Sequence, residues 1–131
     1  MKLMMSMLTM LLVSGCHLLS TQATLDPAYR DYFLQDHQRQ CKRAADNSGD
    51  PRVCPCVANR MLNKLPAQTH DWLQQAFIIR QQQPSISHDA MLEQLAKTTG
   101  KTSHELQSAI EQSLGKAFVE AQAICVRRSQ E

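Results

Sequence analysis

Apolar side chains recur every three or four residues over most of the chain after residue 25, and no stretch alternates convincingly between apolar and polar positions. A period near 3.6 residues is typical of amphipathic helices, whereas half-buried strands alternate with a period of two. Turn and cap signals divide the pattern into five segments. The sequence therefore predicts an all-α fold, a small bundle of about five helices.

Prolines mark the first three predicted helices. Asp26 followed by Pro27 is a typical cap and first helical position, and this helix should end before the turn at residues 47–51. We expect the second helix to begin near Pro55 and to stop before Pro66, because proline is disfavoured inside a helix. The third helix is expected to begin after Thr69.

The last two predicted helices have clearer boundaries. Ser87 is a suitable cap for the fourth helix, and Gly100 can take the left-handed conformation that ends it. Thr102 and Glu105 form the Thr-x-x-Glu capping box that starts the fifth helix. One face of this last helix gathers Leu106, Ile110, Leu114, Phe118, Ala121 and Cys125.

The third predicted helix carries two residues that could meet a partner. Trp72 lies in an apolar arc with Leu73, Ala76, Phe77 and Ile79, and Ile78 falls among glutamines outside that arc. Trp72 and Ile78 are therefore candidates for a partner surface. For Trp72, packing in the core is an equally good interpretation.

The first residues have the parts of a secretory signal. Lys2 precedes a short apolar run with Ser6 and Thr9 inside it, and small residues follow at Val13-Ser14-Gly15-Cys16. A transmembrane helix is the alternative, but it needs about 20 apolar residues. The segment resembles a bacterial lipoprotein signal peptide that ends in a lipobox, although Val13 stands where leucine is usual.

The resemblance implies that residues 1–15 are removed and that Cys16 receives acyl chains such as palmitate. His17 stands where the family's inner-membrane retention signal often has aspartate, which implies anchoring in the outer membrane. Residues 16–25 would then be the lipidated cysteine and a short tether, and residues 26–131 a single domain facing the periplasm.

The charge of the chain is nearly balanced. It has 14 Lys and Arg against 12 Asp and Glu, and cleavage would also remove Lys2. Such a surface does not favour electrostatic capture of nucleic acid, and neither does a place in the cell envelope. We therefore expect no nucleic-acid partner.

Four cysteines would remain in the mature domain, Cys41, Cys54, Cys56 and Cys125. An even set in an exported protein predicts two structural disulfides, for which three pairings exist. Pairing of Cys54 with Cys56 is the least favoured, because Cys54 precedes proline and should be extended while Cys56 enters a helix. The Cys-Pro-Cys corner should thus form one disulfide to the first helix and one to the last. The sequence does not show which of Cys54 and Cys56 pairs with Cys41 and which with Cys125.

A metal site is the alternative use of these residues. His37 lies one turn before Cys41, and with reduced thiols these two residues plus Cys54 and Cys56 are ligand types for zinc or copper(I). The Cys-x-Cys spacing is tighter than in common zinc sites, and Cys125 would be left unpaired on a buried face. His37 can equally be a core or boundary residue with a hydrogen-bonded ring.

Two further patterns carry weaker chemistry. Cys54 and Cys56 could exchange disulfides, although the Cys-x-x-Cys context of thioredoxin-like proteins is absent. Histidine stands beside an acid at three predicted helix starts, where the three pairs could form a metal or proton-sensing patch. Helix capping with an incidental histidine explains the same pattern. These pairs are Thr69-His70-Asp71, Ser87-His88-Asp89 and Ser103-His104-Glu105.

No catalytic or cofactor motif follows Cys16, so the sequence predicts a protein that is not an enzyme and has no cofactor. The leading hypothesis is an outer-membrane lipoprotein whose helical domain binds or scaffolds an envelope protein. The alternative is a metal-handling lipoprotein that uses His37 and the cysteines. Nothing in the sequence selects the partner.

Overall fold

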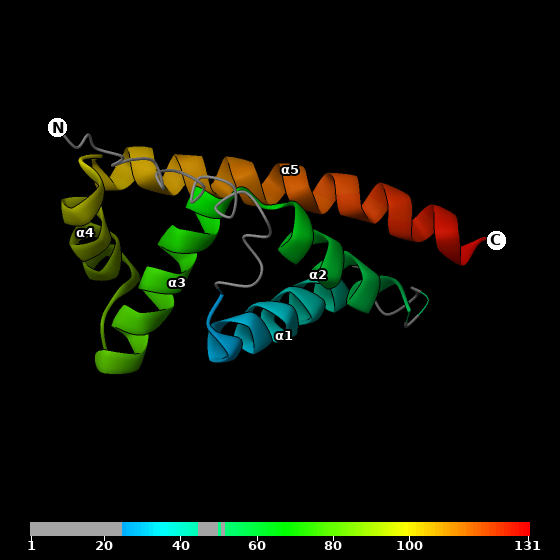
Figure 1. Ribbon diagram of the computed structural model, residues 1–131, viewed down its shortest axis with the longest axis horizontal. Coiled ribbons are helices and arrows are strands. Elements are labelled where there is room, and N and C mark those ends of the chain that lie inside the picture. Colours follow the sequence, from blue (N-terminus) through cyan, green and yellow to red (C-terminus); the bar gives the residue numbers. More distant parts are fainter. Residues whose placement is uncertain (1–24, 45–49, 51) are drawn as a thin grey trace, which may run out of the picture.

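A computed structural model describes residues 25–44, 50 and 52–131. This part of the chain forms five α-helices and no strand, which confirms the predicted all-α fold (Figure 1). The helices are α1 (Pro27–Ala44), α2 (Val53–Lys64), α3 (Ala67–Gln82), α4 (His88–Thr99) and α5 (Ser103–Ser129). The predicted signal peptide, Cys16 and the tether up to residue 24 lie outside the described residues, as does most of the turn at 47–51.

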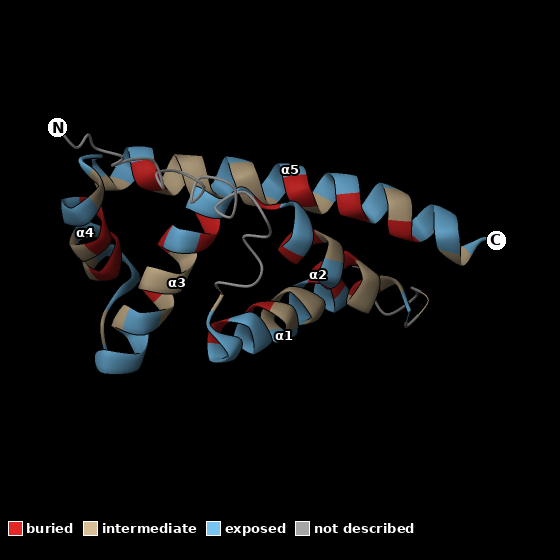
Figure 2. Cartoon of the chain, in the orientation of Figure 1, coloured by how far each residue is buried: buried red, intermediate tan, exposed pale blue. Residues whose placement is uncertain are grey.

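Helix α5 joins two groups of helices. It has 27 residues and a length of about 40 Å. Helix α2 packs beside its C-terminal half and α1 packs on α2, whereas α3 and α4 lie near its N-terminal end (Figure 1). Buried segments occur on α5 from near its start to near its end (Figure 2). None of the helices in the described ranges is long and apolar enough to span a bilayer.

Each group has its own hydrophobic core. The first core lies between α1, α2 and α5 and is centred on Phe33, Val57 and Met61, together with Cys125. The second lies between α3, α4 and the start of α5 and includes Trp72, Leu95 and Leu106. The molecule therefore consists of two small groups of packed helices that share one long helix.

Three predicted helix starts are confirmed by hydrogen bonds. The Asp26 carboxylate accepts from the backbone N–H of Ala28 at 2.8 Å, and the Ser87 hydroxyl accepts from Ala90 at 3.1 Å. Thr102 and Glu105 form the reciprocal capping box. Gly100 ends α4 with φ of +71°, as predicted for a left-handed stop.

Two helix starts differ from the prediction. Helix α2 begins at Val53 rather than near Pro55, because the Asp50 carbonyl accepts from the Val53 N–H at 2.9 Å and starts the helix earlier. Pro55 then lies in the first turn, where its missing N–H needs no partner. Helix α3 begins at Ala67 rather than after Thr69, since the Pro66 carbonyl accepts from the His70 N–H.

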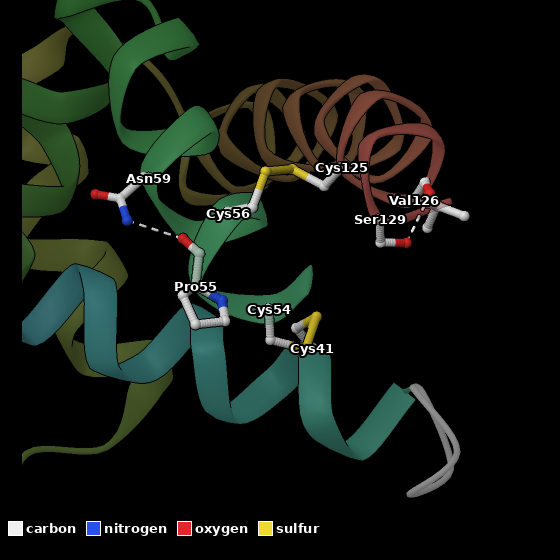
Figure 3. Close-up of a disulfide and its surroundings, with 8 residues drawn as sticks. All are labelled: Cys41, Cys54, Pro55, Cys56, Asn59, Cys125, Val126 and Ser129. Carbon is white, nitrogen blue, oxygen red and sulfur yellow. Dashed lines mark hydrogen bonds between the residues drawn. A yellow bond between two sulfur atoms is a disulfide. The ribbon is translucent and has the colours of Figure 1, made fainter. Parts of the chain in front are cut away.

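Two disulfides fix the Cys-Pro-Cys corner, as predicted (Figure 3). Cys54 joins Cys41 of α1 with a Cα–Cα distance of 5.5 Å, and Cys56 joins Cys125 of α5 at 5.9 Å. The expected divergence of Cys54 and Cys56 is correct, but its predicted reason is wrong. Cys54 is helical rather than extended, and residues two apart on a helix point about 200° apart.

Candidate functional site

The predicted metal ligands do not form a metal site in the described residues. Cys41, Cys54 and Cys56 have their sulfur atoms in disulfides, and no group of three or more His, Cys, Asp or Glu side chains is arranged to hold a metal there. His37 is instead a boundary residue: its Nδ1 donates to the Phe33 carbonyl at 2.9 Å and its ring stacks on Phe33 at 4.0 Å. The structure gives the metal alternative no support.

The three histidines that follow capping-type residues have different surroundings. His88 accepts from the Arg80 guanidinium at 3.1 Å on the surface, and His104 is exposed. His70, in contrast, is only 4 % exposed. The interpretation of the histidine as incidental is therefore wrong for His70.

His70 holds three helices together. Its Nε2 lies 2.7 Å from the Leu62 carbonyl at the end of α2, and its Nδ1 lies 2.9 Å from the Tyr29 hydroxyl on α1. A carbonyl can only accept, so Nε2 carries the proton and Nδ1 accepts from Tyr29. Burial lowers the pKa of His70 and raises the pKa of Tyr29, which keeps both groups neutral.

The two candidates for a partner surface, Trp72 and Ile78, differ in burial. Trp72 is 7 % exposed and belongs to the second core, so it offers no surface to a partner and the core interpretation is the right one. Ile78 is 45 % exposed on α3. Ile78 does not line the groove described next, so it marks a separate position on the surface.

An open groove of about 630 Å³ lies between α1, α3, α4 and α5. Its floor and walls are mostly apolar, and all five helices contribute to them, α2 only through Met61. The apolar side chains that form it include Phe33, Phe77, Met91, Leu92, Leu114 and Phe118. A hollow of this size and character is typical of a binding site in a folded protein.

Polar side chains line the same groove. Asp36 accepts from the Gln40 amide at 2.7 Å on α1, and Glu111 accepts from the Gln107 amide at 2.8 Å on α5. The pair formed by Arg80 and His88 adds a cation from α3. An apolar floor with polar groups around it is the arrangement that protein-binding surfaces share.

The groove was not predicted from the sequence, although several of its residues were. The apolar face of α5 was predicted to contain Ile110, Leu114 and Phe118, and all three are only partly buried. Their incomplete burial shows that the α5 face is wider than the helices packed against it. Sequence periodicity gives the direction of an apolar face but not whether another helix covers it.

Comparison of the chain with models of known protein families, with curated protein sequences and with solved structures gives no match.

Proposed function

We propose that this chain is an outer-membrane lipoprotein, anchored through acylated Cys16, whose disulfide-stapled domain binds an envelope protein on the periplasmic side without catalysing a reaction. The observation that carries the proposal is the apolar groove between α1, α3, α4 and α5. A small domain gains stability by covering apolar side chains, so a groove left open by its own helices favours an external occupant.

The rigidity of the groove supports a binding role. Helix α1 is joined to α2 by the Cys41–Cys54 bond, and α2 is joined to α5 by the Cys56–Cys125 bond. These bonds tie one wall of the groove to its floor. A site held in one shape loses little conformational entropy when a partner binds, which favours affinity.

The lipobox supports the proposed location. Nine residues separate Cys16 from Asp26, which caps α1, and they span about 30 Å at full extension. Several acyl chains hold a protein at a membrane far more firmly than one chain does. A domain tethered this closely would keep its groove near partners in the same membrane, where their effective concentration is high.

The structure does not support the alternative of a metal-handling function. It needs reduced thiols at Cys41, Cys54 and Cys56, and all three are in disulfides. Disulfide exchange at Cys54 and Cys56 is also unsupported, because each sulfur is bound to a different helix rather than to its neighbour.

The anchor is tested by labelling cells with a palmitate analogue and separating their two membranes. We expect the full chain to carry the label in the outer-membrane fraction and the Cys16→Ser variant to lose both the label and that location. If the full chain carries no label and has the same location as the Cys16→Ser variant, the proposed anchor is contradicted.

The binding role is tested with the photo-crosslinking residue p-benzoylphenylalanine in the full chain in intact cells. We place it at Gln107 in the groove and, as a matched control, at exposed Glu120, which lies outside the groove and about 140° away from Gln107 around α5. A protein adduct at Gln107 that is absent at Glu120 is expected. The absence of protein adducts at both positions would contradict a partner-binding function.

A further inference from the structure

We infer that the groove receives an amphipathic α-helix of the partner, with its apolar face on the floor and basic residues directed toward Asp36 and Glu111. This inference rests on the proposed binding function and specifies the chemistry of the partner. Three observations carry it: the helical spacing of the groove residues, the glycine in its floor and the charges along it.

The groove is lined by rows of side chains at helical spacing. On α1 the accessible row runs over about 18 Å and consists of Tyr32, Asp36, Gln40 and Ala44, while Tyr29 and Phe33 are buried beneath it. On α5 a second row consists of Gln107, Glu111, Leu114 and Phe118. Rows separated by three and four residues form the ridges between which another helix packs, so the groove has the form of a seat for a helix.

Gly115 supports the close approach of an occupant. It lies in the middle of α5 and lines the groove, and its φ is not positive. A Cβ atom at this position would meet nothing within 4 Å. Neither the backbone conformation nor the packing of the described chain therefore requires a glycine, although glycine weakens a helix. A partner helix crossing α5 at Gly115 could come closer than any side chain would allow.

Charge selects the kind of helix. Asp36 and Glu111 lie on different helices of the groove, and each accepts a hydrogen bond from a neutral glutamine amide. Among the described residues the one ion pair is Asp50 with Arg52, so no described cation forms an ion pair with either groove carboxylate. Arg80 donates to His88 and keeps its positive charge, so among the lining side chains two carboxylates outnumber one guanidinium. Lysine or arginine on the occupant complements these carboxylates, whereas the phosphate of a lipid headgroup would be repelled.

The test is to digest the adduct formed at Gln107 in intact cells and to sequence the crosslinked segment. We expect a segment of another envelope protein with apolar residues at helical spacing and with at least one Lys or Arg on its polar side. The Asp36→Lys and Glu111→Lys double variant should reduce the yield of this adduct about fivefold or more. The matched control Glu120→Lys adds a positive charge outside the groove and should leave the yield unchanged.

Other results would overturn the inference. A lipid adduct, an adduct to a second copy of this chain, or a segment without helical spacing would each show a different occupant. An adduct yield in the charge-reversed variant equal to that of the wild type would contradict the inference that the occupant carries basic residues. A protein adduct at Glu120 with none at Gln107 would leave the binding function standing but place it outside the groove, so the two failures can be told apart.

Discussion

Two buried hydrogen bonds of His70 fix the arrangement of α1, α2 and α3. The ring of His70 bonds both the Tyr29 hydroxyl and the Leu62 carbonyl, and Tyr29 is only 1 % exposed. No buried side-chain nitrogen or oxygen in the described ranges lacks a hydrogen-bond partner. Loss of one member would leave the others unpaired in the core, which costs more than the bond itself contributes.

The titration of His70 predicts that acid destabilises the fold. Folding lowers the pKa of this imidazole from its usual value of 6.5, chiefly through burial. The unfolded chain therefore binds more protons as the pH falls below about 6.5, and the free energy of unfolding decreases there, whereas His70 contributes no pH dependence well above that value. Urea unfolding at pH 7.5 and pH 5.5 measures the difference.

The matched variants are His70→Gln and His104→Gln. The first should be less stable at pH 7.5 and should lose less stability on acidification than the wild type. The second changes an exposed histidine and should behave as the wild type. If His70→Gln and the wild type lose the same stability between the two pH values, His70 does not carry the acid sensitivity.

Gly115 predicts a substitution that stabilises the protein. Alanine is favoured over glycine inside a helix by about 1 kcal/mol, and a Cβ at this position meets nothing within 4 Å. Gly115→Ala should therefore raise the free energy of unfolding by about 1 kcal/mol in urea. Gly100→Ala is the control and should lower it, because Gly100 has a φ of +71°. A loss of stability in Gly115→Ala would mean that the site is more crowded than the structure shows.

The sequence could not show which of the four histidines in the described ranges is buried. His37 was a candidate ligand on the apolar arc of its helix, and His70 was grouped with His88 and His104 at helix starts. Local sequence fixes the position of a histidine on its helix. Burial of His70 depends on Tyr29, which is 41 residues away in the chain, so only the tertiary structure distinguishes it.

At the scale of elements, the boundaries predicted from side-chain caps were correct. Asp26, Ser87 and Thr102 each act on backbone N–H groups within three residues, so the signal and its effect are both local. The start of α3 depends instead on a backbone bond to Pro66. At α2 the Asp50 carboxylate accepts from the Arg52 N–H at 2.8 Å, but the prediction assigned Asp50 to the preceding turn. Helix α2 begins about two residues earlier than predicted and helix α3 three residues earlier.

The two disulfides should stabilise the domain unequally. Cys41–Cys54 closes a loop with a sequence separation of 13 and Cys56–Cys125 one of 69. Loop-closure entropy then predicts about 1.5 kcal/mol more stabilisation from the longer loop. Urea unfolding of the Cys56→Ala/Cys125→Ala and Cys41→Ala/Cys54→Ala double variants measures this difference. Greater destabilisation in the second variant would contradict the prediction.

At the scale of the whole molecule, the helical content and the disulfide corner could be predicted, whereas the groove could not. Amphipathic spacing predicted that Leu114 and Phe118 face other helices. Their partial exposure arises because α2, with α1 packed on it, lies beside one half of α5 while α3 and α4 lie near its other end. The space between these groups depends on helix crossing geometry, which periodicity does not contain.

The groove and the anchor together define the proposed role. The disulfides hold α1 against α2 and α2 against α5, so one wall and the floor of the groove keep their positions without an occupant. Acylated Cys16 would place this preformed groove within about 30 Å of a membrane. Under the proposed function, this domain would position a helix of its partner at the membrane surface.

The most direct test is the yield of the partner adduct at Gln107 in intact cells, compared between the wild type, Gly115→Leu and Gly115→Ala. A Cβ atom at 115 meets nothing within 4 Å and the position lines the groove, so we expect a leucine there to extend into the groove, leave the fold intact and exclude the partner helix. We predict an adduct in the wild type, at least a fivefold loss in Gly115→Leu, and a smaller loss in Gly115→Ala, in proportion to side-chain size. An undiminished adduct in a folded, disulfide-bonded Gly115→Leu variant would contradict occupation of the groove by a partner.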